Sequence, residues 1–146
     1  MKKFLSSLLA LTMILSLVIV PANAAAGDTI DGVSVSSSNV TLTKLGDTTD
    51  VTFNFPQNLN AGSTVTVNSK EVMYNGKLSH SIASSNNNVA MCSQNGNTVT
   101  ITAVGYGETI ISYTVSLAYL DNGTAGTATQ TLTTKVTVAA PNVTYS

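Results

Sequence analysis

His80 is the only histidine in the chain and the first residue to consider for catalysis, because imidazole is the commonest general acid or base in enzymes. A Ser-His-Asp arrangement needs a serine and an acid held beside that histidine. Serine and aspartate are spread throughout this sequence, so their presence is uninformative, and no G-x-S-x-G elbow occurs. We therefore expect no catalytic residue and no enzyme activity, with His80 a solvated residue at the base of a hairpin.

Cys92 is the only cysteine, so the chain forms no internal disulfide and no cysteine-based zinc site. It follows Val89-Ala90-Met91 on a predicted strand, where a free cysteine usually behaves as a small buried apolar residue. The alternative is a reactive or intermolecular thiol, which needs exposure and a lowered pKa. We expect Cys92 to be inert.

Four aspartates near the start of the chain raise the question of a calcium site, because calcium takes several oxygen ligands. These residues are Asp28, Asp31, Asp47 and Asp50. Their spacing matches no calcium-binding loop, and aspartate is ordinary in turns. We therefore expect neither a metal nor a cofactor.

Tyrosines are the remaining candidates for ligand contact. Tyr74 and Tyr106 lie in or beside predicted turns, where exposed rings can stack on sugars. Tyr113 and Tyr119 alternate with apolar residues of a predicted strand, so we expect them to pack inside. Tyr74 and Tyr106 are thus the possible ligand contacts, and they form the basis of a carbohydrate-binding alternative.

The N-terminal residues have the three-part pattern of a secretory signal peptide. Met1-Lys2-Lys3 is positive, residues 4–20 are mostly apolar, and residues 21–24 supply small residues for cleavage. Residues 1–24 are therefore expected to be removed, leaving a secreted or cell-surface chain with no membrane span. A retained anchor is the alternative, but the apolar stretch is short for a span and no charged stop signal follows it.

Charge excludes nucleic acid as a partner. Loss of Lys2 and Lys3 with the signal peptide leaves four scattered lysines against seven acidic residues, a formal charge of −3, and the chain has no arginine. A nucleic-acid binder needs a clustered basic face to neutralise phosphates. The polar residues here are mainly Thr, Ser and Asn, which suit a half-exposed sheet.

Period-two alternation predicts an all-β domain over residues 33–140, after a linker at 25–32 and before a tail at 141–146. Residues 33–35 and 40–43 suggest a first strand that is broken in the middle, and Val51, Phe53 and Phe55 share one face of the next. The longest alternation places five residues on one face: Ile111, Tyr113, Val115, Leu117 and Tyr119.

Glycine-containing pairs predict the turns between these strands. Asn75-Gly76 and Asn95-Gly96 are expected to close hairpins, because both residues of such turns adopt φ > 0 easily. Asp121 to Thr127 is expected to be a flexible loop of small residues. Several short strands with regular turns favour an immunoglobulin-like antiparallel β-sandwich of about seven to nine strands.

The central residues resemble the bacterial immunoglobulin-like domain of group 2. The resemblance rests on Ile82-x-Ser84-Ser85-Asn86-x-x-Val89-Ala90, then Asn95-Gly96, then Val99-Thr100-Ile101-Thr102-Ala103, then Gly107-x-x-Ile110. Strands at 40–42 and 135–138 look like the first and last strands of that module. The chain departs from it in having Ile82 where the family often has Trp, and in a longer region between Phe55 and Lys77.

The resemblance implies an extracellular spacer or adhesive module of a bacterial protein. We therefore expect a secreted, non-enzymatic chain that acts in cell-surface adhesion, in protein contact or as a structural spacer. Its partner would be a cell-surface protein or polysaccharide. The alternative is a small secreted carbohydrate-binding module.

Overall fold

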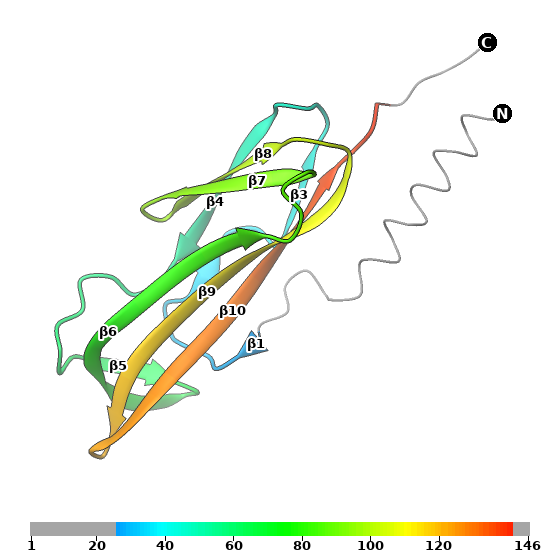
Figure 1. Cartoon of the computed structure of the whole chain (residues 1–146). Helices are drawn as coiled ribbons and strands as arrows, with labels where there is room; N and C mark the ends of the chain where they lie inside the picture. The colour runs from blue at the N-terminus through cyan, green and yellow to red at the C-terminus, as the bar shows by residue number, and fades with distance from the viewer. Residues whose placement is uncertain (1–25, 142–146) are drawn as a thin grey trace, which may run out of the picture.

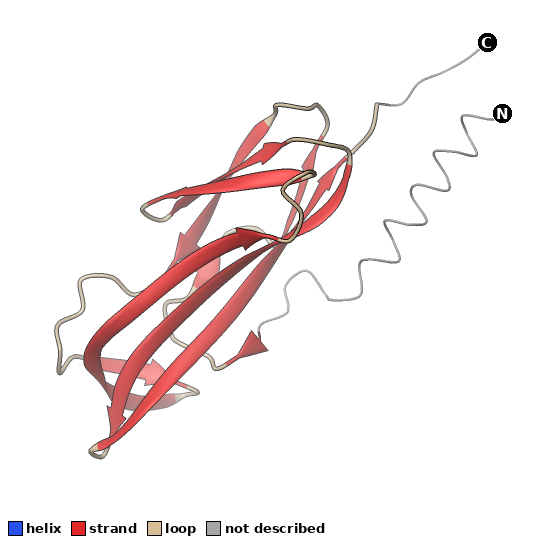
Figure 2. Ribbon diagram, in the orientation of Figure 1, coloured by secondary structure: helices blue, strands red, loops and turns tan. Residues whose placement is uncertain are grey.

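The computed structural model describes residues 26–141 and is built entirely from strands and loops in that range (Figures 1 and 2). The predicted signal peptide and the end of the predicted tail, residues 142–146, lie outside the described residues. The ten strands are β1 (Ala26–Gly27), β2 (Ser34–Val35), β3 (Asn39–Leu42), β4 (Thr48–Asn54), β5 (Thr64–Val67), β6 (Lys70–Ser84), β7 (Ala90–Asn95), β8 (Thr98–Ala103), β9 (Gly107–Asp121) and β10 (Thr124–Val138).

The strands form a sandwich of two sheets. One sheet has the order β2-β4-β8-β7, and the other has the order β1-β10-β9-β6-β5, with β3 also on β10. β2 and β3 can be regarded as one strand that is broken in the middle. Its first half is followed across one sheet by β4, β8 and β7, and its second half is followed across the other sheet by β10, β9 and β6. This is the immunoglobulin strand order, so the predicted sandwich is confirmed. It is not purely antiparallel, because β3 runs parallel to β10.

Alternation along the strands produces the core. Phe53 on β4 and Tyr113 on β9 are fully buried, and their ring centroids lie 5.1 Å apart. Phe55, immediately after the end of β4, lies with its ring centroid 5.0 Å from that of Phe53. Tyr119, also predicted to pack inside, is partly buried against the same cluster. The inward faces predicted for these two strands are therefore confirmed.

The hydroxyl of Tyr113 is satisfied inside the core. It donates a hydrogen bond of 2.8 Å to Oγ1 of Thr134, and that hydroxyl donates to the carbonyl oxygen of Ser37 at 2.7 Å. The chain of two bonds ties β9 and β10 to the segment that changes sheets between β2 and β3. Burial raises the pKa of Tyr113 to about 12.

The raised pKa of Tyr113 predicts a loss of stability in alkaline solution. An unfolded tyrosine ionises near pH 10.0, whereas folded Tyr113 ionises near 12, so the folded state holds this proton more tightly. The contribution of the protonated Tyr113 hydroxyl to the stability of the folded state is complete below pH 10 and is lost as the pH rises from 10 to 12. Urea titrations over that range should show a falling free energy of unfolding. Tyr113→Phe should flatten the fall, and an equally steep fall in this variant would contradict the assignment.

Two turn predictions are wrong. Asn75-Gly76 closes no hairpin, because β6 continues through it with a bulge between Tyr74 and Leu78, where Gly76 has φ 81°. Residues 121–127 form no long loop either, because β9 and β10 stay paired up to a two-residue turn at Asn122-Gly123, with φ of 49° and 84°. Asn-Gly accommodates positive φ in a bulge or in a turn, so the pair alone does not decide between them.

The expected linker is wrong for residues 26–32, which belong to the fold. β1 pairs with β10, and a side chain at Gly27 would collide with the carbonyl oxygen of Thr129. Ile30 is only 2% exposed, and its N–H donates to Oε1 of buried Gln130 at 2.8 Å. The N–H of Asp31 then reaches the carbonyl oxygen of Thr66 on β5 at 3.0 Å.

This N-terminal segment joins the two edges of the larger sheet. It contacts β10 on one side and β5 on the other, so the sheet closes on itself through this segment. The carboxylate of Asp28 accepts hydrogen bonds from the side-chain amide of Asn68 at 2.9 Å and from the N–H of Thr129 at 3.0 Å. Those two bonds lower the pKa of Asp28.

The two sheets differ in length. β6, β9 and β10 each have 15 residues, whereas β7 and β8 have six. In Figure 1 the β7–β8 hairpin covers only the half of the long sheet that lies away from the β9–β10 turn. The loop between β4 and β5 lies at the border of the covered half, and the sandwich opens there.

Candidate functional site

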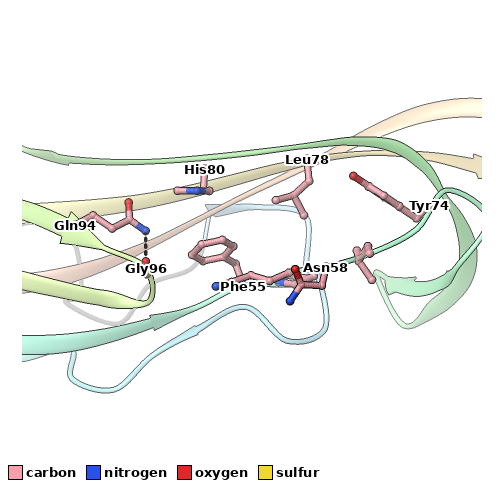
Figure 3. A pocket seen from close by; sticks show the side chains of 10 residues that line it. Phe55, Asn58, Tyr74, Leu78, His80, Gln94 and Gly96 are labelled. Atoms are coloured by element: carbon pink, nitrogen blue, oxygen red, sulfur yellow. Dashed lines mark hydrogen bonds between the residues drawn. The ribbon is translucent and has the colours of Figure 1, made fainter.

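A groove of about 560 Å³ lies where the sandwich opens, between β6 of the long sheet and the β7–β8 turn of the short one (Figure 3). Its volume is in the range of small-ligand sites. Residues 55–59 form one wall, and the inward-facing side chains of β6 form the other. The ten lining residues are Phe55, Pro56, Gln57, Asn58, Leu59, Tyr74, Leu78, His80, Gln94 and Gly96.

The apolar part of the groove is continuous with the core. Phe55 lies between the buried ring of Phe53 and the imidazole of His80, whose centroid is 4.3 Å from that of Phe55 at an interplanar angle of 31°. Phe55 and Tyr74 are only 9% and 7% exposed, so little of either ring reaches solvent. Leu78, half-buried, lies between Tyr74 and His80 along β6 (Figure 3).

The polar part of the groove is made of amides. The side-chain amide of Gln94 donates to the carbonyl oxygen of Gly96 at 3.0 Å, as Figure 3 shows. Gln57 donates to Oδ1 of Asn97, and Asn97 donates to Oδ1 of Asn54 at 3.2 Å. Aspartate, glutamate, lysine and arginine are not among the lining residues. The groove therefore suits a neutral ligand with apolar groups.

One sheet edge beside the groove has no neighbouring strand among residues 26–141. β5 pairs with β6 only over Lys70–Met73, which leaves the stretch from Leu78 onward paired on one side only. The N–H of Ser85 donates to the carbonyl oxygen of Ile110, so Ser85 and Ile110 form a hydrogen-bonded pair between the end of β6 and β9. Because such pairs alternate along an antiparallel ladder, Leu78, His80 and Ile82 direct their N–H and C=O groups away from β9.

His80 is exposed, as expected, but it lies within β6 and not at the base of a hairpin. Its side chain is on the face of the sheet that carries Val115 and Leu117, because β6 pairs with β9 in that register. No hydrogen bond joins it to a serine or an aspartate in the part of the chain that the structure describes. Its contact with Phe55 makes it part of the groove wall.

Tyr74 and Tyr106 do not form one ligand platform. Tyr74 is buried, because its position on β6 faces inward, and it pairs with Tyr119 near the end of β9. Tyr106 is 46% exposed and immediately precedes the start of β9. The strand between them spans roughly 40 Å at about 3.3 Å per residue. Tyr74 lines the groove, whereas Tyr106 stands alone at the other end.

The four aspartates considered for a calcium site, where we expect no metal, separate in the fold. Asp28 is held by Asn68 and Thr129, and Asp50 accepts a hydrogen bond from Thr100 at 2.8 Å. Within residues 26–141, no three His, Cys, Asp or Glu side chains gather closely enough to hold a metal ion.

Cys92 is partly buried and packs against the core from β7. Burial raises the pKa of its thiol, which is opposite to the shift that a reactive cysteine needs. We expect a disulfide reagent at pH 8 to label the native protein several-fold more slowly than a free cysteine. Unfolding in urea should restore fast labelling, and fast labelling without urea would contradict the expected inertness.

The groove itself was not predicted from the sequence. The sequence predicts Phe55 on the inward face of a strand, but it does not indicate Leu78 and Gln94 as ligand contacts. Their common signal is weak: both lie on stretches of strand that are paired on one side only and have no charged residue at an inward position. Which two edges meet depends on the packing of the sheets, and that is not a local property of the sequence.

No protein-family model matches this chain, and a search of curated proteins finds no match. Residues 26–141 contain no helix of the length and hydropathy needed to cross a membrane. The functional argument therefore rests on the fold and on the groove.

Proposed function

We propose that the chain is a secreted, non-enzymatic immunoglobulin-like module, of the bacterial group 2 type, that makes protein contacts at the cell surface. The observation that carries this proposal is the groove, where a continuous apolar surface meets a stretch of β6 that has no neighbouring strand on one side among residues 26–141. The signal-peptide pattern of residues 1–24 supports secretion. The sequence pattern of residues 82–110 supports the group 2 assignment.

The proposal is tested on intact cells of the producing bacterium. The full chain, expressed with its own first 24 residues, should be found in the medium or on the surface with Ala25 as its first residue. The purified mature protein should bind the cells saturably, and protease treatment of the cells should remove the binding. Retention inside the cell, or no saturable binding, would contradict the proposal.

A carbohydrate-binding module is the second candidate function, favoured by the uncharged, amide-rich lining of the groove. In this case glycosidase treatment of the cells, and not protease, should remove the binding. A glycan array should show a signal that Gln94→Ala reduces. Tyr106→Ala tests the isolated exposed tyrosine separately, because Tyr106 does not line the groove.

A further inference from the structure

We propose that the free edge of β6, over Leu78–Ile82, binds an extended segment of a partner protein as an added β-strand. This inference rests on the proposed function and specifies the partner's chemistry. The added strand would continue the line of β5 along the edge of β6. Its alternate side chains would enter the groove between Leu78, His80 and Phe55.

The edge has the properties of a strand acceptor. Exposed sheet edges are usually protected by lysine, proline or a covering segment, because unpaired N–H and C=O groups attract other strands. Residues 78–82, Leu-Ser-His-Ser-Ile, contain no lysine, acidic residue or proline. By contrast, β1 and β3 cover β10, and β5 covers the first residues of β6. This stretch is thus left unprotected where its neighbours are covered.

The hydrogen-bonding groups on this edge repeat every second residue. Leu78, His80 and Ile82 each direct one N–H and one C=O outward, so an extended backbone could pair with all three. The same residues turn their side chains toward the groove or the adjoining core. A bound strand would therefore gain backbone hydrogen bonds and apolar contacts at once, the combination that β-strand addition uses.

The chain itself shows what this edge accepts. β5, with the sequence Thr-Val-Thr-Val, pairs antiparallel with the first part of β6 and buries Val65 and Val67 while its threonines face outward. Beyond β5, the N–H of Tyr74 still bonds to the carbonyl oxygen of Ser63 at 2.7 Å. The partner segment should therefore be uncharged on its groove side, alternating β-branched or other apolar residues with small polar ones.

The groove is less suited to a sugar than to a strand. Stacking on a sugar needs an open ring face, but Phe55 already contacts His80 and Tyr74 is almost fully buried. One amide hydrogen of Gln57 and one of Gln94 are engaged within the chain. By contrast, the outward backbone groups of Leu78, His80 and Ile82 have no neighbouring strand in the described part of the chain.

Peptide selection on the full chain tests the proposal. A displayed library of random linear peptides should yield sequences with alternating apolar residues and no internal proline. The best sequence, as a capped synthetic peptide, should slow hydrogen exchange at the amides of Leu78, His80 and Ile82. N-methylation at every second peptide residue should abolish binding in one register and leave it in the other. Protection elsewhere, or equal effects of both methylation registers, would overturn the proposal.

His80→Pro provides the matching change in the protein. Proline removes the outward N–H without removing a bond to β9, so the strand should persist while peptide affinity falls roughly tenfold or more. Ser79→Ala, a change to a neighbour whose N–H bonds to β9, should leave peptide affinity unchanged. If His80→Pro does not fold, Leu78→Lys introduces a charge at the same edge and should give the same loss. Unchanged affinity in a folded His80→Pro or Leu78→Lys variant would overturn the proposal.

The two proposals fail in different ways. In one outcome the protein binds cells saturably and protease removes the binding, but neither His80→Pro nor the selected peptide reduces it. This outcome would overturn the strand site and leave the proposed function standing. Peptide binding at β6 without any cell binding would contradict the surface function and support the site. If no peptide is selected and cello- or chito-oligosaccharides perturb Phe55 and Gln94, the strand site is overturned in favour of a sugar-binding site.

Discussion

Phe53→Ala is expected to lower the free energy of unfolding by about 3–5 kcal/mol, the usual cost of deleting a buried aromatic ring. Phe53 is fully buried and lies between the rings of Phe55 and Tyr113, with centroid distances of 5.0 and 5.1 Å. Alanine would leave a cavity between the two sheets that the surrounding β-branched side chains fill only in part. Urea unfolding followed by tyrosine fluorescence measures the change.

Phe53→Leu is the matched control, because it keeps most of the apolar volume and removes only the ring. It should cost clearly less than alanine. The expected loss is a large share of the 5–15 kcal/mol that stabilises a typical domain, so the alanine variant should also melt at a much lower temperature. A loss below about 0.5 kcal/mol, the size of an ordinary surface change, would mean that Phe53 is not at the centre of the core.

The core strands could be predicted because one physical rule decides them. In a sandwich each strand buries one face, so period-two alternation identifies which side chains turn inward. This held for Val51 and Phe53 on β4, for Phe55 directly after it, and for Ile111 and Tyr113 on β9. The break between residues 35 and 40 was also visible, and the structure shows that it is where the chain moves from one sheet to the other.

The turns were predictable only in part. An Asn-Gly pair indicates that the backbone can adopt positive φ, but it does not indicate whether the chain reverses direction there. Asn95-Gly96 falls at a hairpin between β7 and β8 as predicted, whereas Asn75-Gly76 falls in a bulge. The hairpin before β6 is formed instead by Asn68-Ser69, with φ of 52° and 65°. Strand pairing over many residues outweighs the preference of one dipeptide, so local chemistry alone could not locate these turns.

The groove could not be predicted, because it arises from a difference in length between two sheets. The outward direction of the amides at Leu78 and His80 depends on their register with β9, and their lack of a neighbour depends on where β5 ends. Both are long-range properties. His80 stands out in the sequence as the only histidine, but its partner Phe55 is distant in the sequence and could not be predicted.

Ile30→Ala is expected to lower the free energy of unfolding by about 2–5 kcal/mol, although Ile30 lies in a segment whose small, polar composition predicts a linker. Ile30 is 2% exposed, and it pairs with Val67 of β5 while its N–H bonds to Gln130 of β10. Its side chain thus fills the space where the long sheet closes on itself. The loss should also appear as faster hydrogen exchange in β5, because β5 would lose one of its two neighbours. Urea titration and exchange mass spectrometry measure the two effects.

Thr29→Ala is the matched control, because Thr29 is the exposed neighbour of Ile30 and its backbone bonds to Asn68 do not require its side chain. This change should cost no more than about 0.5 kcal/mol. An equally small cost for Ile30→Ala would mean that residues 26–31 are a dispensable linker after all. A large cost would place a core residue of the domain only six positions after Ala24, in the segment whose composition predicts a linker.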